Sequence, residues 1–516
     1  MRIKNSMRNM ITSISSNIVT IIIGLLAQAI FIKIMGIEYL GLNGLFTNII
    51  SMLGIVELGI GSAIIYNLYK PIAINDVETI KSLMNFYKKS YNIIGIVVLT
   101  IGLIIIPFLP LIIEDVTVKI NVPLIYILFL LDIVFSYFLS YKRSILYASQ
   151  KNYLINLIHI GYTILLNIGQ LLMLFYTKNY YLYLIVKIIV RIIENLIITY
   201  IVNKEYSYLK EDAKKLDPTI EKDIIKKVKA LFFHKIGGFV VLGTDNIIIS
   251  KFLGLVSVGL YSNYYMIINA VQTLFSQALV ALTPSVGNLL VKENKNKTFE
   301  VFKKIRFMNF WIATFTSVCI LNMMQQFITI WIGEEYLLDD IVLIVLVFNL
   351  FQKLMRSTYQ TFKEAAGIYY EDRFVPLLES LINIIVSIIG VKLIGLAGVF
   401  IGTIISGFVL WFYSYPKYVY KKLFDRSYKD YLKETLGYII LFIVISYLTY
   451  YINNIYLVNN IYFEFVKNIL IAIIVPNILM LLVFIKNDNF KYYIQLIKTK
   501  FTKKIKNWGF DFDNER

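Results

Sequence analysis

Residues 10–34 read MITSISSNIVTIIIGLLAQAIFIKI, an apolar run in which Lys33 is the only charged residue. A helix that crosses a bilayer needs about 20 mostly apolar residues, so this run is long enough to span one. Thirteen further runs of this kind lie near 42–69, 90–113, 121–146, 153–177, 180–202, 231–253, 258–290, 307–332, 341–362, 374–394, 396–416, 434–452 and 463–485. The sequence therefore predicts an all-α polytopic membrane protein with about 14 transmembrane helices.

The basic residues between these runs predict the orientation. If the N-terminus is cytoplasmic, the inside segments are 1–9, 70–89, 147–152, 203–230, 291–306, 363–373, 417–433 and 486–516. Together with Lys142 and Arg143 at a helix end, they hold about 40 of the 51 Lys and Arg residues, as the positive-inside rule requires. The outside turns hold only Lys119, Lys178 and Lys392. We therefore expect both termini in the cytoplasm. The heavy use of Ile, Asn, Lys and Tyr suggests an AT-rich bacterial genome, so the expected location is a bacterial cytoplasmic membrane.

Composition limits the classes of partner and cofactor. The chain is 58% hydrophobic and only 16% charged, which leaves no room for a large soluble domain. Its net charge of +18 indicates attraction to anionic membrane lipids rather than to nucleic acid, because the basic residues lie beside helix ends. With one cysteine, Cys319, and two histidines, we expect no disulfide framework, no metal site and no cofactor.

An internal repeat divides the chain. Residues 33–43 read KIMGIEYLGLN and residues 251–261 read KFLGLVSVGLY, so a lysine, two glycines and a leucine recur in register. Six predicted helices separate the two copies, and an even number gives both copies the same orientation, as in transporters built from parallel repeats. The predicted division is an N-terminal six-helix bundle (1–202), a cytoplasmic linker (203–230), a C-terminal six-helix bundle (231–416), two additional helices (417–485) and a basic tail (486–516).

Several charged residues fall inside the predicted spans, where an ionisable side chain costs roughly 2.5–3.5 kcal/mol and rarely faces lipid. Lys187 and Arg191 are i,i+4 and share a helix face with Glu194, and Lys353 and Arg356 are i,i+3. Guanidinium and ammonium groups bind phosphate oxygens, so we predict that the four cations bind a substrate diphosphate. The alternative is that Arg191 pairs with Glu194 and that Lys353 and Arg356 reach the cytoplasmic interface.

Four carboxylates are candidates for coupling or charge pairing: Glu57, Asp132, Glu194 and Asp245. The competing roles are cation coupling, helix–helix pairing and pairing with the basic residues, and we favour pairing. His159 is expected to be a polar packing residue rather than a proton relay.

Catalytic motifs are missing from the sequence. It has no G-x-x-x-x-G-K-[ST] loop, no H-E-x-x-H and no G-x-S-x-G. The predicted outside loops are also short, which argues against a membrane-embedded glycan polymerase or ligase. We therefore predict a transporter and not an enzyme.

The stretch YLGLNGLFTNIISMLGIVELGIGSAIIYNLYKPIAINDVETIKSLMNFYKK (39–89) resembles the opening of Wzx-type polysaccharide-export flippases. Further similar stretches are TDNIIISKFLG (244–254), WIGEEYLL (331–338), LINIIVSI (381–388) and GLAGVFIGTIIS (395–406). The resemblance covers about residues 7–420. It implies the multidrug/oligosaccharidyl-lipid/polysaccharide (MOP) exporter superfamily, with two pseudo-symmetric, MATE-like bundles. It also implies that Glu57 and Asp245 are family-typical positions.

The cargo implied by this resemblance is an undecaprenyl-diphosphate-linked oligosaccharide, carried from the inner to the outer leaflet for a capsule, an O-antigen or another surface polysaccharide. Proton or sodium coupling or the membrane potential would drive transport, and the polysaccharide polymerase machinery is an expected partner. Two alternatives stay open at this point. One is a MATE-type drug or cation antiporter, which would not need a basic cavity, and the other is the glycan enzyme.

Overall fold

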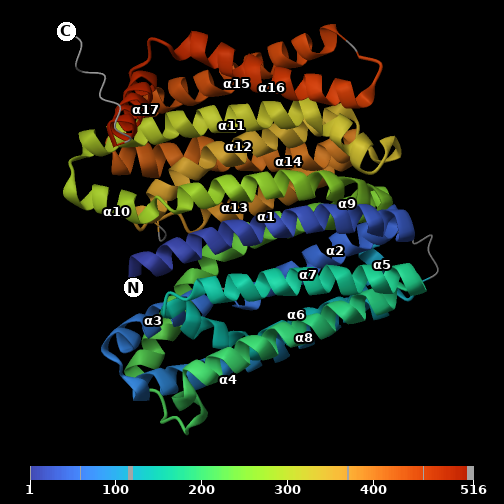
Figure 1. Ribbon diagram of the computed structural model, residues 1–516, viewed down its shortest axis with the longest axis vertical. Helices are drawn as coiled ribbons and strands as arrows, with labels where there is room; N and C mark the ends of the chain where they lie inside the picture. Colours follow the sequence, from blue (N-terminus) through green and yellow to red (C-terminus); the bar gives the residue numbers. More distant parts are fainter. Residues whose placement is uncertain (1, 58–59, 114–119, 369–370, 457, 508–516) are drawn as a thin grey trace. The chain divides into compact units, whose positions relative to one another are not determined.

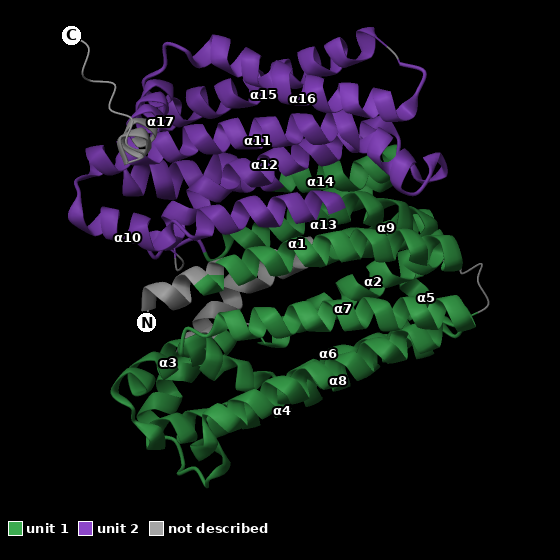
Figure 2. Cartoon of the chain, viewed as in Figure 1, with its two compact units in different colours: residues 1–266, 373–406 green, residues 267–372, 407–516 purple. Residues whose placement is uncertain are grey.

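The structure is a computed structural model of the chain and describes residues 2–57, 60–113, 120–368, 371–456 and 458–507. The regular secondary structure of these residues is helical throughout (Figure 1). Contacts group the chain into two compact units (Figure 2). Unit 1 comprises residues 1–266 and 373–406, and unit 2 comprises residues 267–372 and 407–516.

The helices of unit 1 are α1 (Arg2–Met35), α2 (Ile37–Leu53), α3 (Ile60–Ile74), α4 (Val77–Ile105), α5 (Leu109–Ile112), α6 (Val122–Ala148), α7 (Asn152–Thr177), α8 (Tyr180–Glu205) and α13 (Val375–Ile394). Two helices run from one unit into the other, α9 (Pro218–Val280) and α14 (Leu396–Val409). The helices of unit 2 are α10 (Thr283–Lys292), α11 (Lys295–Trp331), α12 (Asp340–Ala365), α15 (Tyr428–Ile455), α16 (Ile461–Phe484) and α17 (Asp488–Asn507). Wide π-helical turns, Leu410–Ser414 and Pro416–Leu423, continue α14. Short 3-10 turns lie at Gly54–Glu57, Ile106–Phe108, Ser207–Lys210 and Glu334–Tyr336.

Side-chain caps mark where several helices begin. Asp76 accepts hydrogen bonds from the Thr79 hydroxyl at 2.6 Å and from the Thr79 amide at 3.0 Å, which together lower the pKa of the Asp76 carboxyl, and the amide bond caps the start of α4. Asn121 caps α6 in the same way, and Asn179 caps α8 by accepting from two backbone amides. These residues satisfy backbone N–H groups that have no partner inside the helix.

Twelve of the described helices are long and apolar enough to cross a membrane, which confirms a multi-pass, all-helical membrane protein. The sequence predicts two more spans. One corresponds to α8, which is equally long but carries Lys187, Arg191 and Glu194. The other arises within α9, because Gly254 interrupts its helical geometry with φ 80° and ψ 172° and so divides the helix in two.

Large apolar side chains also cover the outside of the helices. On α1, five of them recur every three or four residues and are 46–62% exposed: Ile11, Ile14, Ile18, Ile22 and Leu26. A continuous apolar stripe of this kind is unfavourable in water and is typical of a lipid-facing surface.

The two copies of the internal repeat contact each other within unit 1. Gly36 has φ 90° and ψ 170°, nearly the same conformation as Gly254, its counterpart in the second copy. A Cβ atom on Gly41 would lie 2.0 Å from the carbonyl oxygen of Leu255, and one on Gly259 would lie 2.4 Å from that of Ile37. The contact is therefore reciprocal, and glycine is required at 41 and 259 because α2 and α9 approach so closely.

Each unit is held together by extensive contacts between pairs of helices. In unit 1, α6 packs against α4 and α8, and α7 packs against α1 and α8. In unit 2, α11 contacts α12, α15 and α16, and large aromatic side chains such as Phe302, Tyr359 and Tyr420 fill the space between them. The predicted six-helix bundles, 1–202 and 231–416, stay a prediction.

Candidate functional site

Helix α8 has a charged face and an apolar face on opposite sides. Lys187, Arg191 and Glu194 lie on one side, at the i,i+4 and i,i+3 spacing that aligns side chains along a helix. The opposite side carries exposed isoleucines, Ile185, Ile189 and Ile193. The charges therefore face neighbouring helices of unit 1 while the isoleucines face outward, as expected for ionisable residues in a transmembrane helix.

Asp132 of α6 contacts both cations of α8. Its Oδ2 lies 3.2 Å from Nζ of Lys187, and its Oδ1 lies 3.4 Å from Nε of Arg191. Asp132 is buried, with 8% exposure, whereas the Lys187 and Arg191 side chains are 27% and 20% exposed. The carboxylate is thus covered by protein, but the two cations stay partly accessible.

Glu194 connects α8 to two further helices. Its Oε2 accepts a hydrogen bond from Nη1 of Arg191 at 2.9 Å and lies 3.0 Å from Nη2 of Arg143 on α6. Its Oε1 lies 3.4 Å from Nδ1 of His159 on α7. Glu194 is only 2% exposed, so this carboxylate holds three helices together at one buried point.

Aromatic rings support the cations. The Arg191 guanidinium carbon lies 4.4 Å from the ring centre of Tyr162, which also stacks on His159. Lys187 Nζ lies 4.9 Å from the ring centre of Phe129. Such rings stabilise a cation on their faces and leave its N–H groups free to point elsewhere.

We call this group of side chains the charged cluster: Asp132, Arg143, His159, Lys187, Arg191 and Glu194. With His159 neutral, three positive and two negative charges leave a formal charge of +1. A cluster with excess positive charge and partly accessible cations is suited to binding an anion.

The other two predicted substrate-binding cations, Lys353 and Arg356, lie on α12 in unit 2, and both are half-buried. A Cβ atom on Gly407 would lie 2.9 Å from Nη1 of Arg356 and 2.4 Å from Oε1 of Gln352. The missing side chain at Gly407 therefore makes room for the Arg356 guanidinium. A single cavity lined by all four cations stays a prediction.

Glu57 ends the 3-10 turn that follows α2, and Tyr91 of α4 donates a hydrogen bond to its Oε1 at 2.9 Å. This contact joins the turn after α2 to α4, and Glu57 itself is half-buried.

Asp245 lies on α9 and is half-buried. The hydroxyl of Thr244, the residue before Asp245, donates a hydrogen bond to Oδ1 of Asn383 on α13 at 3.3 Å. Asn383 also donates to Thr403 of α14 at 3.2 Å. The residue before Asp245, Thr244, is therefore part of a polar region that joins α9, α13 and α14.

Sequence reasoning missed two cations that the structure places in polar networks. Arg143 was assigned to a helix end, but it is a member of the charged cluster. Arg306 was assigned to the cytoplasmic segment 291–306, but it is 3% exposed and contacts Glu434 and the Tyr420 hydroxyl. A count of charges between spans gives no signal for either contact, because each partner comes from another helix.

The model of the polysaccharide biosynthesis protein family matches residues 6–290, more than half of the chain.

The chain belongs to this family.

A search of curated proteins finds no match.

Several solved transporters resemble this chain in fold. The lipid II flippase MurJ, in an inward-closed conformation, aligns with a TM-score of 0.68 and 17% identity, over 92% of this chain and 99% of MurJ. An inward-facing MATE multidrug resistance transporter of the MOP superfamily aligns with a TM-score of 0.60 and 15% identity, over 77% of this chain and 94% of the transporter. A mutant of the Vibrio cholerae MATE transporter VcmN aligns with a TM-score of 0.55 and 15% identity, over 80% of this chain and 97% of VcmN.

These likenesses give the chain the MOP-superfamily fold. Membership of the polysaccharide biosynthesis protein family and this fold agree with the transporter that the sequence predicts.

Proposed function

We propose that this family member is a flippase that moves undecaprenyl-diphosphate-linked oligosaccharide units from the inner to the outer leaflet by alternating access. The observation that carries the proposal is the charged cluster, in which buried carboxylates hold partly accessible cations on membrane-spanning helices. The family supports a role in polysaccharide biosynthesis, and the structurally similar MurJ is a lipid II flippase.

Lys187 and Arg191 would bind the diphosphate. Asp132 and Glu194 pair with these cations at 2.9–3.4 Å. A diphosphate brings more negative charge and a geometry that a guanidinium fork matches, so its oxygens would replace part of the carboxylate contacts. Because the carboxylates stay behind to rebind the cations, release on the other side of the membrane would be favourable too.

Lys353 and Arg356 would bind the same cargo in our proposal. Their helix, α12, would belong to the second of two pseudo-symmetric bundles, and rocking of the bundles would expose the cations to alternate sides of the membrane. The reciprocal glycine contact between the two copies of the repeat supports an axis of pseudo-symmetry along the membrane normal.

The proposed arrangement in the membrane has fourteen spans, with α8 as one span and α9 as two. Both termini would be cytoplasmic, as the positive-inside rule predicts. Transport would serve a capsule, an O-antigen or another surface polysaccharide, with the polymerase machinery as the next partner. The membrane potential or a proton or sodium gradient would supply the energy, with Glu57 and Asp245 as the carboxylates available for coupling.

The test uses bacteria that lack this protein and depend on it for one surface polysaccharide. We expect the lipid-linked oligosaccharide to accumulate on the cytoplasmic leaflet and the wild-type chain to restore export. Arg191→Gln should fail to restore it, while Lys178→Gln, at a lysine predicted to lie outside, should restore it. Membrane levels of each variant are measured by immunoblot.

A double variant separates substrate binding from internal pairing. If Lys187 only neutralises Asp132, then Lys187→Gln combined with Asp132→Asn should restore the export that Lys187→Gln alone loses. If Lys187 binds the diphosphate, the double variant should stay inactive. Full export by the double variant would contradict the proposed role of Lys187.

A further inference from the structure

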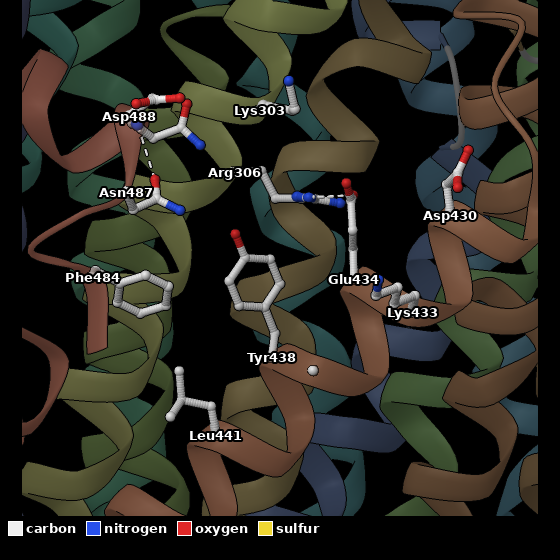
Figure 3. A pocket seen from close by; sticks show the side chains of 12 residues that line it. Lys303, Arg306, Asp430, Lys433, Glu434, Tyr438, Leu441, Phe484, Asn487 and Asp488 are labelled. Atoms are coloured by element: carbon white, nitrogen blue, oxygen red, sulfur yellow. Dashed lines mark hydrogen bonds and ion pairs between the residues drawn. The ribbon is translucent and has the colours of Figure 1, made fainter. Parts of the chain in front are cut away.

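Unit 2 contains a second polar site, separate from the charged cluster. A cavity of about 660 Å³ lies among α11, α15 and the turn that joins α16 to α17 (Figure 3). Three cationic and three anionic side chains line it: Lys303, Arg306, Lys433, Asp430, Glu434 and Asp488. The lining is therefore formally neutral but strongly charged.

Two of these charged residues, Arg306 and Glu434, form an ion pair with each other. Arg306 is 3% exposed, and its Nη2 lies 2.5 Å from Oε2 of Glu434, which also accepts a hydrogen bond from Tyr420 at 2.6 Å. Because the cation of this pair is buried and its carboxylate, 33% exposed, is also hydrogen-bonded to Tyr420, we treat the pair as a fixed part of the cavity rather than as a group for a ligand.

The other four charged side chains that line the cavity are not part of this pair. Lys433 and the Asp430 carboxylate form no ion pair with other described side chains. Lys303 contacts the ring of Phe299, and Asp488 is fully exposed, with Lys491 at 3.9 Å. Two ammonium groups and two carboxylates thus line this cavity in addition to the Arg306–Glu434 pair.

The other end of the cavity is apolar. Figure 3 shows Leu441 at the end away from Lys303 and Asp488, with Phe484 and the ring of Tyr438 between them. The charged end lies where α15 and α17 begin, next to segments 417–433 and 486–516, which the charge pattern predicts to be cytoplasmic. A cavity with a charged mouth and an apolar floor at the membrane interface has the polarity of a single phospholipid.

We propose that this cavity binds one inner-leaflet phospholipid whose headgroup is zwitterionic and carries a primary ammonium. Lys303 and Lys433 would hold the phosphate, Asp430 and Asp488 would hold the ammonium, and the start of an acyl chain would lie on Leu441. An anionic headgroup fits less well, because it would bring negative charge next to two carboxylates without a positive group to offset them. The site is distinct from the proposed cargo site.

The test is native mass spectrometry of the purified full chain with an equimolar mixture of phosphatidylethanolamine, phosphatidylcholine and phosphatidylglycerol that share the same acyl chains. We expect phosphatidylethanolamine to be retained at about tenfold higher occupancy than the other two, the ratio that corresponds to one additional charge-assisted contact. Phosphatidylcholine is also zwitterionic but has no N–H donor on its ammonium group. Comparing its occupancy with that of phosphatidylethanolamine therefore distinguishes hydrogen bonding by a primary ammonium from the effect of charge alone.

Two double variants assign the contacts. Asp430→Asn with Asp488→Asn should abolish the preference for phosphatidylethanolamine but keep phospholipid binding, whereas Lys303→Gln with Lys433→Gln should lower the occupancy of all three lipids. Lys297→Gln is the matched control, because Lys297 lies on the same helix as Lys303 but does not line the cavity, and it pairs with Glu293, which precedes that helix.

A wild-type preference for phosphatidylglycerol, or for an added polyprenyl phosphate, would overturn the proposal and make the cavity an anion site. Unchanged selectivity in the Asp430/Asp488 double variant would overturn it as well. Because binding is measured without transport, failure of this proposal is distinguishable from failure of the flippase function.

Discussion

Replacing Glu194 by glutamine tests whether the charged cluster stabilises the protein. Glu194→Gln keeps the size of the side chain and an acceptor oxygen but removes its negative charge. Two guanidinium groups then lose their shared carboxylate, since Arg191 and Arg143 lie 2.9 Å and 3.0 Å from Oε2. Asp132 is the only carboxylate left in the cluster, 3.4 Å from Arg191.

The expected loss is about 3 kcal/mol in the free energy of unfolding. Two unit charges about 4 Å apart attract by about 4 kcal/mol at an effective dielectric constant of 20, so the two lost contacts amount to roughly 8 kcal/mol before desolvation. Removing one partner of a buried ion pair costs about 3–5 kcal/mol in practice. We take the lower end because the Arg191 and Arg143 side chains are 20% and 25% exposed and keep some hydration.

The assay is unfolding of the purified chain by SDS titration in mixed micelles. The matched control is Glu211→Gln, because Glu211 pairs with Lys81 but is 65% exposed, and exposed pairs contribute little. If Glu194→Gln were as stable as Glu211→Gln, water rather than the carboxylate would be stabilising the guanidinium groups. The account of the charged cluster as a buried ion-pair network would then be wrong.

Three further predictions concern packing, unit 2 and topology. Gly41→Ala should lower the free energy of unfolding by about 1–3 kcal/mol, because its Cβ would lie 2.0 Å from a backbone oxygen of the facing helix. Gly161 has open space around it, so Gly161→Ala should instead raise the free energy of unfolding by about 0.5–1 kcal/mol. Equal effects of Gly41→Ala and Gly161→Ala would contradict the close contact between Gly41 and Leu255. Arg306→Met should cost about 3 kcal/mol in the same assay, because it leaves a partly buried carboxylate without its cation; no loss would show that the pair is not needed. In a cysteine-free background, cysteine at Lys214 should react with an impermeant thiol reagent only from the cytoplasmic side, and cysteine at Lys178 only from outside; the reverse pattern would invert the proposed topology.

The sequence alone predicts the features that depend on local spacing and composition. Apolar runs of about 20 residues predict a polytopic membrane protein, and the structure confirms this. The i,i+3 and i,i+4 spacing of Lys187, Arg191 and Glu194 places them on one helix face, because a helix repeats every 3.6 residues. The repeat is also visible in the sequence, and its matching residues Gly36 and Gly254 have nearly the same backbone conformation in the structure.

Only the tertiary structure decides which charges meet. Asp132 and Arg143 reach α8 from α6, and Arg306 is buried against Glu434, 128 residues further along the chain. Which helices become neighbours depends on the packing of whole helix faces, and no periodicity within one helix encodes it. For this reason the sequence identifies the charged residues of the membrane spans, whereas the fold determines their partners, their exposure and the cavity that opens between α11 and α15.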